Sequence, residues 1–185
     1  RTMLTLFDSA FSPFARKVRM VLETKGLEFS ALDGLHADHQ AALAAVNPRR
    51  EVPVLVDGDL VVVNSAHIVA YLEDAYPATP VLPSSTALRA RARHWERVAD
   101  TQLDPIIVDV SLWSWAHRSD QPPPELRPAA QADLDAIYGE LEAALPEGEG
   151  FVCGALSIAE FALFPHLYAT RWLGVGIDAA RFPRL

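Results

Sequence analysis

One short segment constrains the fold of this chain more than any other. Residues 52–63 read VPVLVDGDLVVV, two apolar runs on either side of Asp57-Gly58. An Asp-Gly pair supplies the positive φ angles that a tight primed turn requires, and apolar runs of four to eight residues bounded by turn residues are typical of strands. The segment therefore predicts an antiparallel β-hairpin.

Strand and helix patterns alternate on both sides of this hairpin. Before it, we predict a strand, a helix, a strand and an alanine-rich helix at residues 3–7, 13–26, 28–32 and 36–46. After it, a helix is predicted from Ser65 to Tyr76, where Pro77 stops it. The predicted order of elements is βαβαββα.

A proline- and serine-rich stretch at 77–85 separates this part from one with helical periodicity alone. In the second part we predict helices at 86–117, kinked or interrupted at Pro105, at 129–145, and from Ser157 to near Gly174. The fold class is α/β plus all-α: a first domain at 1–78, a linker at 79–85 and a helical bundle at 86–185.

Composition and charge argue against several classes of partner. The formal net charge is −8, and both halves contain more acidic than basic residues, which disfavours nucleic-acid binding. No apolar run approaches the roughly 18 residues that span a bilayer, and the N-terminus lacks a leader pattern, so we expect a cytoplasmic protein without a membrane partner. The single cysteine, Cys153, excludes an intramolecular disulfide. The six histidines show no metal-ligand spacing, so no metal is expected.

Four segments together resemble the glutathione transferase superfamily, in the family's order and approximate spacing: SPFARKVR at 12–19, NPRREVPVL at 47–55, NSAHIVAYLEDAYP at 64–77 and GALSIAEFALFPHL at 154–167. The resemblance covers nearly the whole chain. It implies a thioredoxin-like first domain followed by an all-α domain. It also implies a homodimeric enzyme that conjugates glutathione, its co-substrate, to a small apolar electrophile.

Ser12 lies directly before Pro13 at a predicted helix start, which is typical of an N-cap that contributes about 1 kcal/mol. Redox relatives in the family have a cysteine at this place, and a serine cannot form a mixed disulfide. A serine can donate a hydrogen bond to a bound thiolate and so lower the pKa of the thiol. The resemblance therefore implies that Ser12 is the catalytic hydroxyl, with Ser9 as the second candidate.

The resemblance also implies a glutathione site along the central segment. Val52-Pro53 matches the family's cis-proline step, where the backbone of Val52 pairs with the cysteinyl part of glutathione; an edge-strand proline is the alternative. Ser65, at the next helix start, matches the serine that holds the γ-glutamyl carboxylate and is also expected to cap that helix. Asn64, before it, stands where the family usually has an acid or an amide.

The chain departs from the family at Glu51, where a base often faces the glycine carboxylate of glutathione. Arg50 or Arg49 is a candidate replacement cation, because a guanidinium binds a carboxylate with two hydrogen bonds. A solvated loop is the equal alternative for both arginines. Phe14 is expected to contact glutathione, and it could form the wall of an apolar pocket with Trp113 and Trp115.

Two expectations concern the second domain. Ser157 and Glu160 have the spacing of a capping box, which is a folding signal, and Cys153 is expected to be a small buried side chain. Relatives usually continue beyond residue 185, so either this is a shortened member that lacks the last helix of the helical domain or the sequence stops early.

Two other functions remain compatible with the sequence. One is a glutathione-dependent isomerase or dehalogenase on the same scaffold, which would differ in the pocket and not in the thiol site. The other is a non-catalytic binding or regulatory protein of the same fold, which Glu51 and Asn64 favour.

Overall fold

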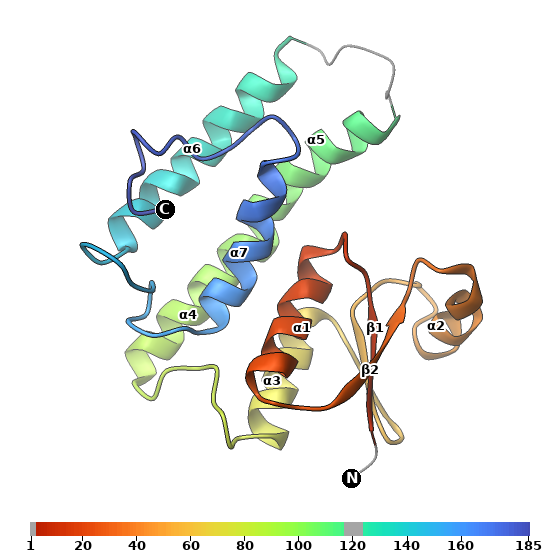
Figure 1. Ribbon diagram of the computed structural model, residues 1–185. Helices are drawn as coiled ribbons and strands as arrows, with labels where there is room; N and C mark the ends of the chain where they lie inside the picture. Colours follow the sequence, from red (N-terminus) through yellow and green to blue (C-terminus); the bar gives the residue numbers. More distant parts are fainter. Residues whose placement is uncertain (1–2, 117–123) are drawn as a thin grey trace. The chain divides into compact units, whose positions relative to one another are not determined.

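The computed structural model describes residues 3–116 and 124–185, without the side chain of Trp115. The chain divides into two compact units, Arg1–Ser84 and Ser85–Leu185. Figure 1 draws the elements of both units.

The first unit has the predicted βαβαββα order. Its elements are β1 (Leu4–Asp8), α1 (Pro13–Thr24), β2 (Phe29–Asp33), the 3-10 turn η1 (Ala37–His39), α2 (Gln40–Val46), β3 (Val54–Asp57), β4 (Leu60–Val63) and α3 (Ser65–Ala75). The strands form one sheet in the order β2-β1-β3-β4. β1 is parallel to β2 and antiparallel to β3, and β4 is antiparallel to β3.

Helices cover both faces of this sheet, α1 and α3 on one side and α2 on the other (Figure 1). Phe7 and Val54, which are register partners, form a buried cluster with Leu43 of α2. Leu6 and Leu55 are the neighbouring register pair and are buried too. Because successive side chains of a strand alternate between faces, this pair belongs to the face that α1 and α3 cover.

The predicted hairpin is confirmed, but its turn is placed one residue later than expected. Asp57 pairs with Leu60, so the two central residues are Gly58 and Asp59. Gly58 has φ of 59° and provides the positive angle alone, as in a turn with glycine at the first central position. Asp57 stays in β3, where its Oδ2 accepts hydrogen bonds from the hydroxyl groups of Tyr71 at 2.8 Å and Tyr76 at 2.5 Å.

A buried ion pair between Lys25 and Glu73 holds the segment after α3 in place within the first unit. Nζ of Lys25 lies 2.5 Å from Oε1 of Glu73, and it donates hydrogen bonds to the carbonyl oxygens of Tyr76 and Thr79. Oε1 of Glu73 also accepts a hydrogen bond from the N–H of Val81. Since the ammonium has three acceptors, its removal from water is compensated.

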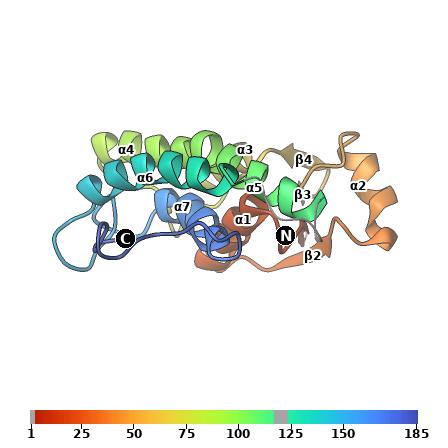
Figure 2. The same cartoon turned by 90° about the horizontal axis from the view of Figure 1, so that it is seen from above.

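The second unit is helical: α4 (Thr86–Val98), the π-helix η2 (Ala99–Leu103), α5 (Asp104–Ala116), α6 (Leu126–Ala144) and α7 (Ile158–Thr170). Contacts join α7 to α4 and α5, and α6 to α5 (Figures 1 and 2). The predicted interruption at Pro105 is a π-helical turn directly before α5, because proline has no N–H for the preceding turn. The last residue of the helix predicted at 86–117 lies outside the described residues.

Three helix boundaries differ from the prediction by three or more residues. The helix predicted at 36–46 begins as the 3-10 turn η1, and α2 itself starts at Gln40. α6 begins at Leu126, before Pro128, since the first turn of a helix does not need the missing N–H. α7 ends at Thr170, earlier than Gly174. None of the described helices combines the length and the apolar character needed to cross a membrane.

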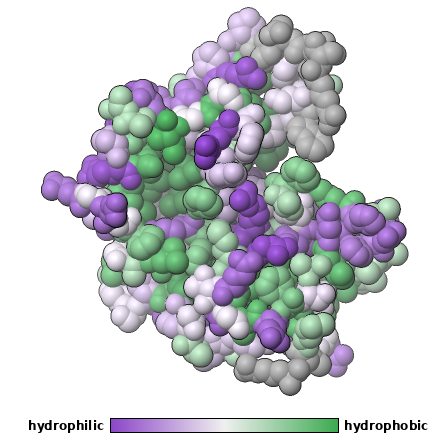
Figure 3. Space-filling view, in the orientation of Figure 1, coloured by the Kyte–Doolittle hydropathy of each residue, from purple (hydrophilic) through white to green (hydrophobic). Residues whose placement is uncertain are grey.

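The surface of the first unit is polar at His36 and η1. Figure 3 shows hydrophilic residues gathered there, and His36 and Asp38 are exposed. Nδ1 of His36 lies 3.6 Å from Oδ2 of Asp38. This face therefore has the character of a solvated surface.

Candidate functional site

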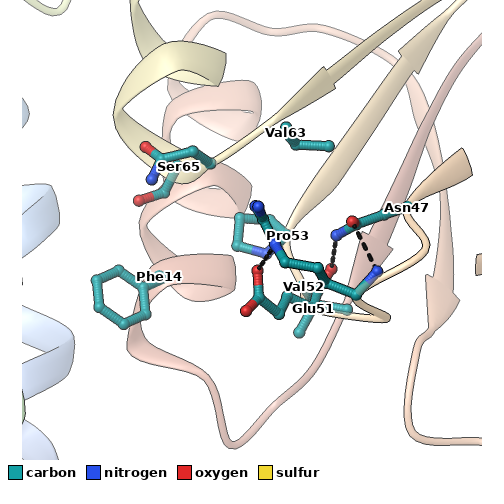
Figure 4. Close-up of a pocket in the computed structure, with 9 residues that line it drawn as sticks. Phe14, Asn47, Glu51, Val52, Pro53, Val63 and Ser65 are labelled. Carbon is teal, nitrogen blue, oxygen red and sulfur yellow. Dashed lines mark hydrogen bonds and ion pairs between the residues drawn. The ribbon is translucent and has the colours of Figure 1, made fainter.

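A cavity of about 320 Å³ lies in the first unit. Its walls come from the first turn of α1, the loop between α2 and β3, the end of β4 and the first residues of α3 (Figure 4). The lining residues are Phe14, Asn47, Arg49, Glu51, Val52, Pro53, Val63, Asn64 and Ser65. A cavity of this volume is in the range of small-molecule sites.

The Val52-Pro53 peptide bond is cis, as predicted. The pairing of β3 with β1 begins at Val54, opposite Phe7, so Pro53 lies just before the strand. The missing N–H of Pro53 therefore removes no hydrogen bond from the sheet, and an edge-strand position is not needed to explain this proline. The backbone of Val52 lies outside the ladder, at the wall of the cavity.

The start of α3 is capped by Asn64, and the expectation that Ser65 caps this helix was wrong. Oδ1 of Asn64 accepts a hydrogen bond from the N–H of Ala66 at 3.1 Å, and Asn64 has φ of 73°. Asparagine tolerates this left-handed backbone better than most residues, so the cap is Asn64, one residue before the predicted Ser65. Ser65 is the first helical residue and is 3% exposed, and capping does not use its hydroxyl.

The start of α1 agrees with the prediction. Oγ of Ser12 accepts a hydrogen bond from the N–H of Ala15 at 3.2 Å, and Pro13 is the first helical residue. This cap occupies an acceptor position of the hydroxyl and leaves its O–H proton for another partner. Ser12 is half-buried and is not itself a lining residue, but Phe14 from the same turn reaches the cavity (Figure 4).

Ser9 is part of the turn between β1 and α1 and does not line the cavity. It is buried, and its Oγ accepts a hydrogen bond from the N–H of Phe11 at 3.2 Å. Its own N–H donates to Oδ1 of Asp8 at 2.7 Å, and Oδ2 of Asp8 pairs with Arg19. These contacts fix the path of the chain into α1.

The loop at 47–51 places one of the two candidate arginines at the cavity. Arg49 is a lining residue and Arg50 is not. Nε of Arg49 lies 2.8 Å from Oε2 of Glu51, and the two side chains are 68% and 64% exposed. Arg50 has φ of 56°, so a left-handed residue stands between the two that pair.

Asn47 and Val63 also line the cavity, although we did not predict them as site residues. Asn47 organises the loop: its Nδ2 donates to the carbonyl oxygen of Glu51 at 3.0 Å, and its Oδ1 accepts from the N–H of Arg49 at 3.3 Å. The Asn47-Pro48 pair was a usable signal, since asparagine side chains bond to the backbone of turns. Val63 precedes Asn64 at the end of β4, and its pattern is that of an ordinary strand residue.

The cavity has little net charge and a polar and an apolar part. Arg49 and Glu51 are the charged members of its lining, and they are paired with each other. Phe14, Pro53 and Val63 are apolar. Among the described residues, no three His, Cys, Asp or Glu side chains gather as a metal site requires. The arrangement suits an organic ligand with polar ends.

Cys153 of the second unit is not a competing nucleophile. Cys153 is buried, and burial raises the pKa of its thiol, which makes it a poor nucleophile. The predicted capping box at Ser157 and Glu160 is present. Trp113 is half-buried on α5, and the side chain of Trp115 lies outside the described residues.

Comparisons with known proteins show what the chain as a whole resembles. The family model described as glutathione S-transferase, N-terminal domain, matches residues 6–80. Glutathione S-transferase U3 of Arabidopsis thaliana is 31% identical over 185 residues, covering 97% of this chain and 80% of that protein. The crystal structure of rice GST1 in complex with glutathione has a TM-score of 0.77 at 31% identity, covering 98% of this chain and 82% of that one. A glutathione S-transferase structure from Rhodospirillum rubrum F11 has a TM-score of 0.81 at 25% identity, covering 98% and 83%.

Proposed function

The chain belongs to the glutathione S-transferase family, and on that premise we propose that the cavity of its first unit is its glutathione site. It is a transferase with glutathione as co-substrate. We assign residues 1–78 as the glutathione-binding domain, 79–85 as the linker and 86–185 as the helical domain.

One observation carries the proposal: the cis Val52-Pro53 step and the first residues of α3 line the same cavity. The backbone of Val52 lies outside the sheet ladder, so its polar groups are placed to pair with an extended peptide, as an added strand would. We assign the cysteinyl residue of glutathione to Val52. This sets the direction in which the rest of the tripeptide runs.

The γ-glutamyl end is assigned to Ser65 and Asn64. A helix N-terminus offers unpaired N–H groups and a partial positive charge, which favour a carboxylate. Ser65 adds a hydroxyl that capping does not use, because Asn64 provides the cap. The carboxylate therefore meets both backbone and side-chain donors.

The thiolate is assigned to the hydroxyl of Ser12. Its O–H donates a hydrogen bond to the sulfur, and the start of α1 adds about 0.3–1 kcal/mol in favour of a negative charge. Both effects lower the pKa of the glutathione thiol from about 8.5. Ser9 is the second candidate, although its hydroxyl is buried in the turn before α1.

The reaction that follows is substitution or addition at an electrophilic carbon. The thiolate lone pair forms the S–C bond, and in a substitution the leaving group departs with the electron pair of its broken bond. A small apolar electrophile is proposed, since Phe14, Pro53 and Val63 give the cavity an apolar part. Product analysis separates conjugation from isomerisation and dehalogenation on the same scaffold.

Three finer attributes are proposed from the family: a homodimer, a cytoplasmic location and a role in detoxification. Light scattering of the purified protein tests the first of these directly. A mass of twice 20.3 kDa is expected, and a monomeric mass contradicts it.

Calorimetric titration with glutathione tests the proposed site. The wild type is expected to bind glutathione more tightly than cysteinylglycine, which lacks the γ-glutamyl group. Ser65→Ala is expected to weaken glutathione binding about tenfold, the effect of a lost hydrogen bond to a charged group. Ser30→Ala is the matched control, a half-buried serine of β2 outside the cavity lining. Absence of binding by the wild type at millimolar glutathione would overturn the proposal.

A further inference from the structure

Arg49 and Glu51 form a charged pair at one side of the cavity. They are the cation and the carboxylate of the nine lining residues, with 2.8 Å between Nε of Arg49 and Oε2 of Glu51. Asn47 bonds to the backbone of both residues, and the N–H of Arg50 donates to the carbonyl oxygen of Asn47 at 2.8 Å. The loop backbone therefore supports the arrangement in which Arg49 and Glu51 meet.

The proposed orientation of glutathione brings its glycine end to this pair. The γ-glutamyl end is assigned to Ser65 and the cysteinyl residue to Val52, and Figure 4 shows Asn47 and Ser65 on opposite sides of Pro53. An extended tripeptide that begins at Ser65 and passes Val52 continues toward the loop at 47–51. Its glycine carboxylate then meets an arginine that already has a carboxylate partner.

Competition for Arg49 follows from these charges. A guanidinium binds a carboxylate best with two parallel hydrogen bonds, and Glu51 occupies Nε of that fork. The ligand must displace Glu51 or share Arg49 with it, and Glu51 also repels a second carboxylate. Both effects act on a ligand with a free glycine carboxylate and are absent for one whose glycine end is neutral.

We propose that Glu51 is a specificity-determining residue at the glycine end of the site, which lowers the affinity for a free glycine carboxylate relative to a neutral ester or amide. This inference rests on the proposed glutathione site. Because both side chains are about two-thirds exposed, the effect is that of a surface ion pair. We expect a change of about two- to fivefold in Kd at low ionic strength.

The test compares glutathione binding by the wild type, Glu51→Gln and Glu28→Gln in calorimetry. Glu28 is an exposed carboxylate of the same unit that does not line the cavity, so its substitution makes the same change in net charge elsewhere. Glu51→Gln is expected to bind glutathione about two- to fivefold more tightly than the wild type, and Glu28→Gln equally tightly. The gain should shrink at high ionic strength, because exposed charges are screened.

A second ligand and a second variant locate the effect. Glutathione esterified at its glycine carboxylate should show little gain from Glu51→Gln, because it offers Arg49 no carboxylate. In the Arg49→Gln background, Glu51→Gln should give a smaller gain in glutathione affinity than in the wild type, since competition for the cation is gone and only the relief of repulsion remains.

The outcomes separate this inference from the proposed site. Equal Kd values for wild type and Glu51→Gln would overturn the role of Glu51 and leave the glutathione site intact. The role of Glu51 would also be overturned if Glu51→Gln tightened binding of the ester as much as binding of glutathione. It would be overturned too if Glu28→Gln tightened glutathione binding as much as Glu51→Gln does. Absence of glutathione binding in every variant would overturn the site itself and this inference with it.

Discussion

Ser12 and Ser157 both cap helices, and they use their hydroxyl groups differently. Ser157 at α7 is 1% exposed; its Oγ accepts from the N–H of Ala159 at 3.3 Å and donates to Oε2 of Glu160 at 2.9 Å. Ser12 at α1 is half-buried, and its cap uses an acceptor position only. A capping serine can act on a ligand only when its proton is not already committed, so Ser157 is structural and Ser12 is a candidate for chemistry.

The residues that follow each cap explain this difference. Glu160 stands in the first turn of α7 and accepts hydrogen bonds from the N–H groups of Val152 and Ser157 as well as from the Ser157 hydroxyl. The first turn of α1 contains no acidic residue. No carboxylate there competes for the Ser12 proton or repels a thiolate at the helix start. An acidic side chain in the first turn thus decides whether the proton of the capping serine is already bonded or is available to a ligand.

The largest effect is expected for Glu160→Ala. The substitution leaves three donors without their acceptor, and buried unsatisfied donors cost about 1–3 kcal/mol each, so the free energy of unfolding should fall by about 3 kcal/mol or more. Denaturant unfolding measures this, with Glu140→Ala as control, because Glu140 is exposed on α6. Equal stability of the two variants would contradict the structural role of the capping box.

Ser12→Ala should act mainly on catalysis. We expect kcat/KM for conjugation to fall about 10- to 100-fold, since one hydrogen bond to the developing charge is lost. The unfolding free energy should fall by only about 1 kcal/mol, the usual contribution of a cap. A loss of activity no larger than the loss of folded protein would place Ser12 with Ser157 as a purely structural serine.

Ser157→Ala provides the matched comparison. It removes a capping hydroxyl of the same kind, so the unfolding free energy should fall by about 1–2 kcal/mol. At temperatures where the variant is folded, kcat/KM should equal that of the wild type. A reduced kcat/KM in the folded variant would show that the two caps do not differ as described.

The smallest effect concerns α3, whose start forms the other end of the site. Tyr71 on α3 donates to Asp57, and this hydrogen bond, with burial, raises the pKa of Tyr71 from 10.0 to about 12. The folded chain therefore holds the tyrosine proton more tightly than the unfolded chain. Its contribution to stability is complete below pH 10 and is lost as the pH rises through 12. Between pH 8 and 11, the free energy of unfolding should fall less in Tyr71→Phe than in the wild type. An identical fall in both proteins would contradict this.

Local signals in the sequence predicted much of the fold correctly. Ser12-Pro13 and the Ser157 to Glu160 spacing identify helix starts because caps act within one turn. The start of α3 shows the limit of such signals. Asn64 and Ser65 are both good caps, and the choice between them depends on the φ of 73° that Asn64 adopts at the end of β4. Gly58 shows the same limit, since strand pairing decides which residues of a turn are central.

The site was less predictable than the fold. The family pattern correctly indicated the cis bond at Val52-Pro53. It left Arg49 and Arg50 equivalent, because sequence spacing does not reveal that Arg50 adopts a left-handed backbone and lies outside the cavity lining. The pairing of Arg49 with Glu51 is likewise a property of the folded loop.

The ionisation of bound glutathione, followed by ultraviolet difference absorbance against pH in the wild type and in Ser12→Ala, is the direct test of the role of Ser12. We expect the wild type to lower the pKa of the bound thiol below about 8.5 and Ser12→Ala to remove most of this shift. A shift that persists in Ser12→Ala would contradict the role of Ser12 and transfer it to Ser9 or to the N–H groups at the start of α1.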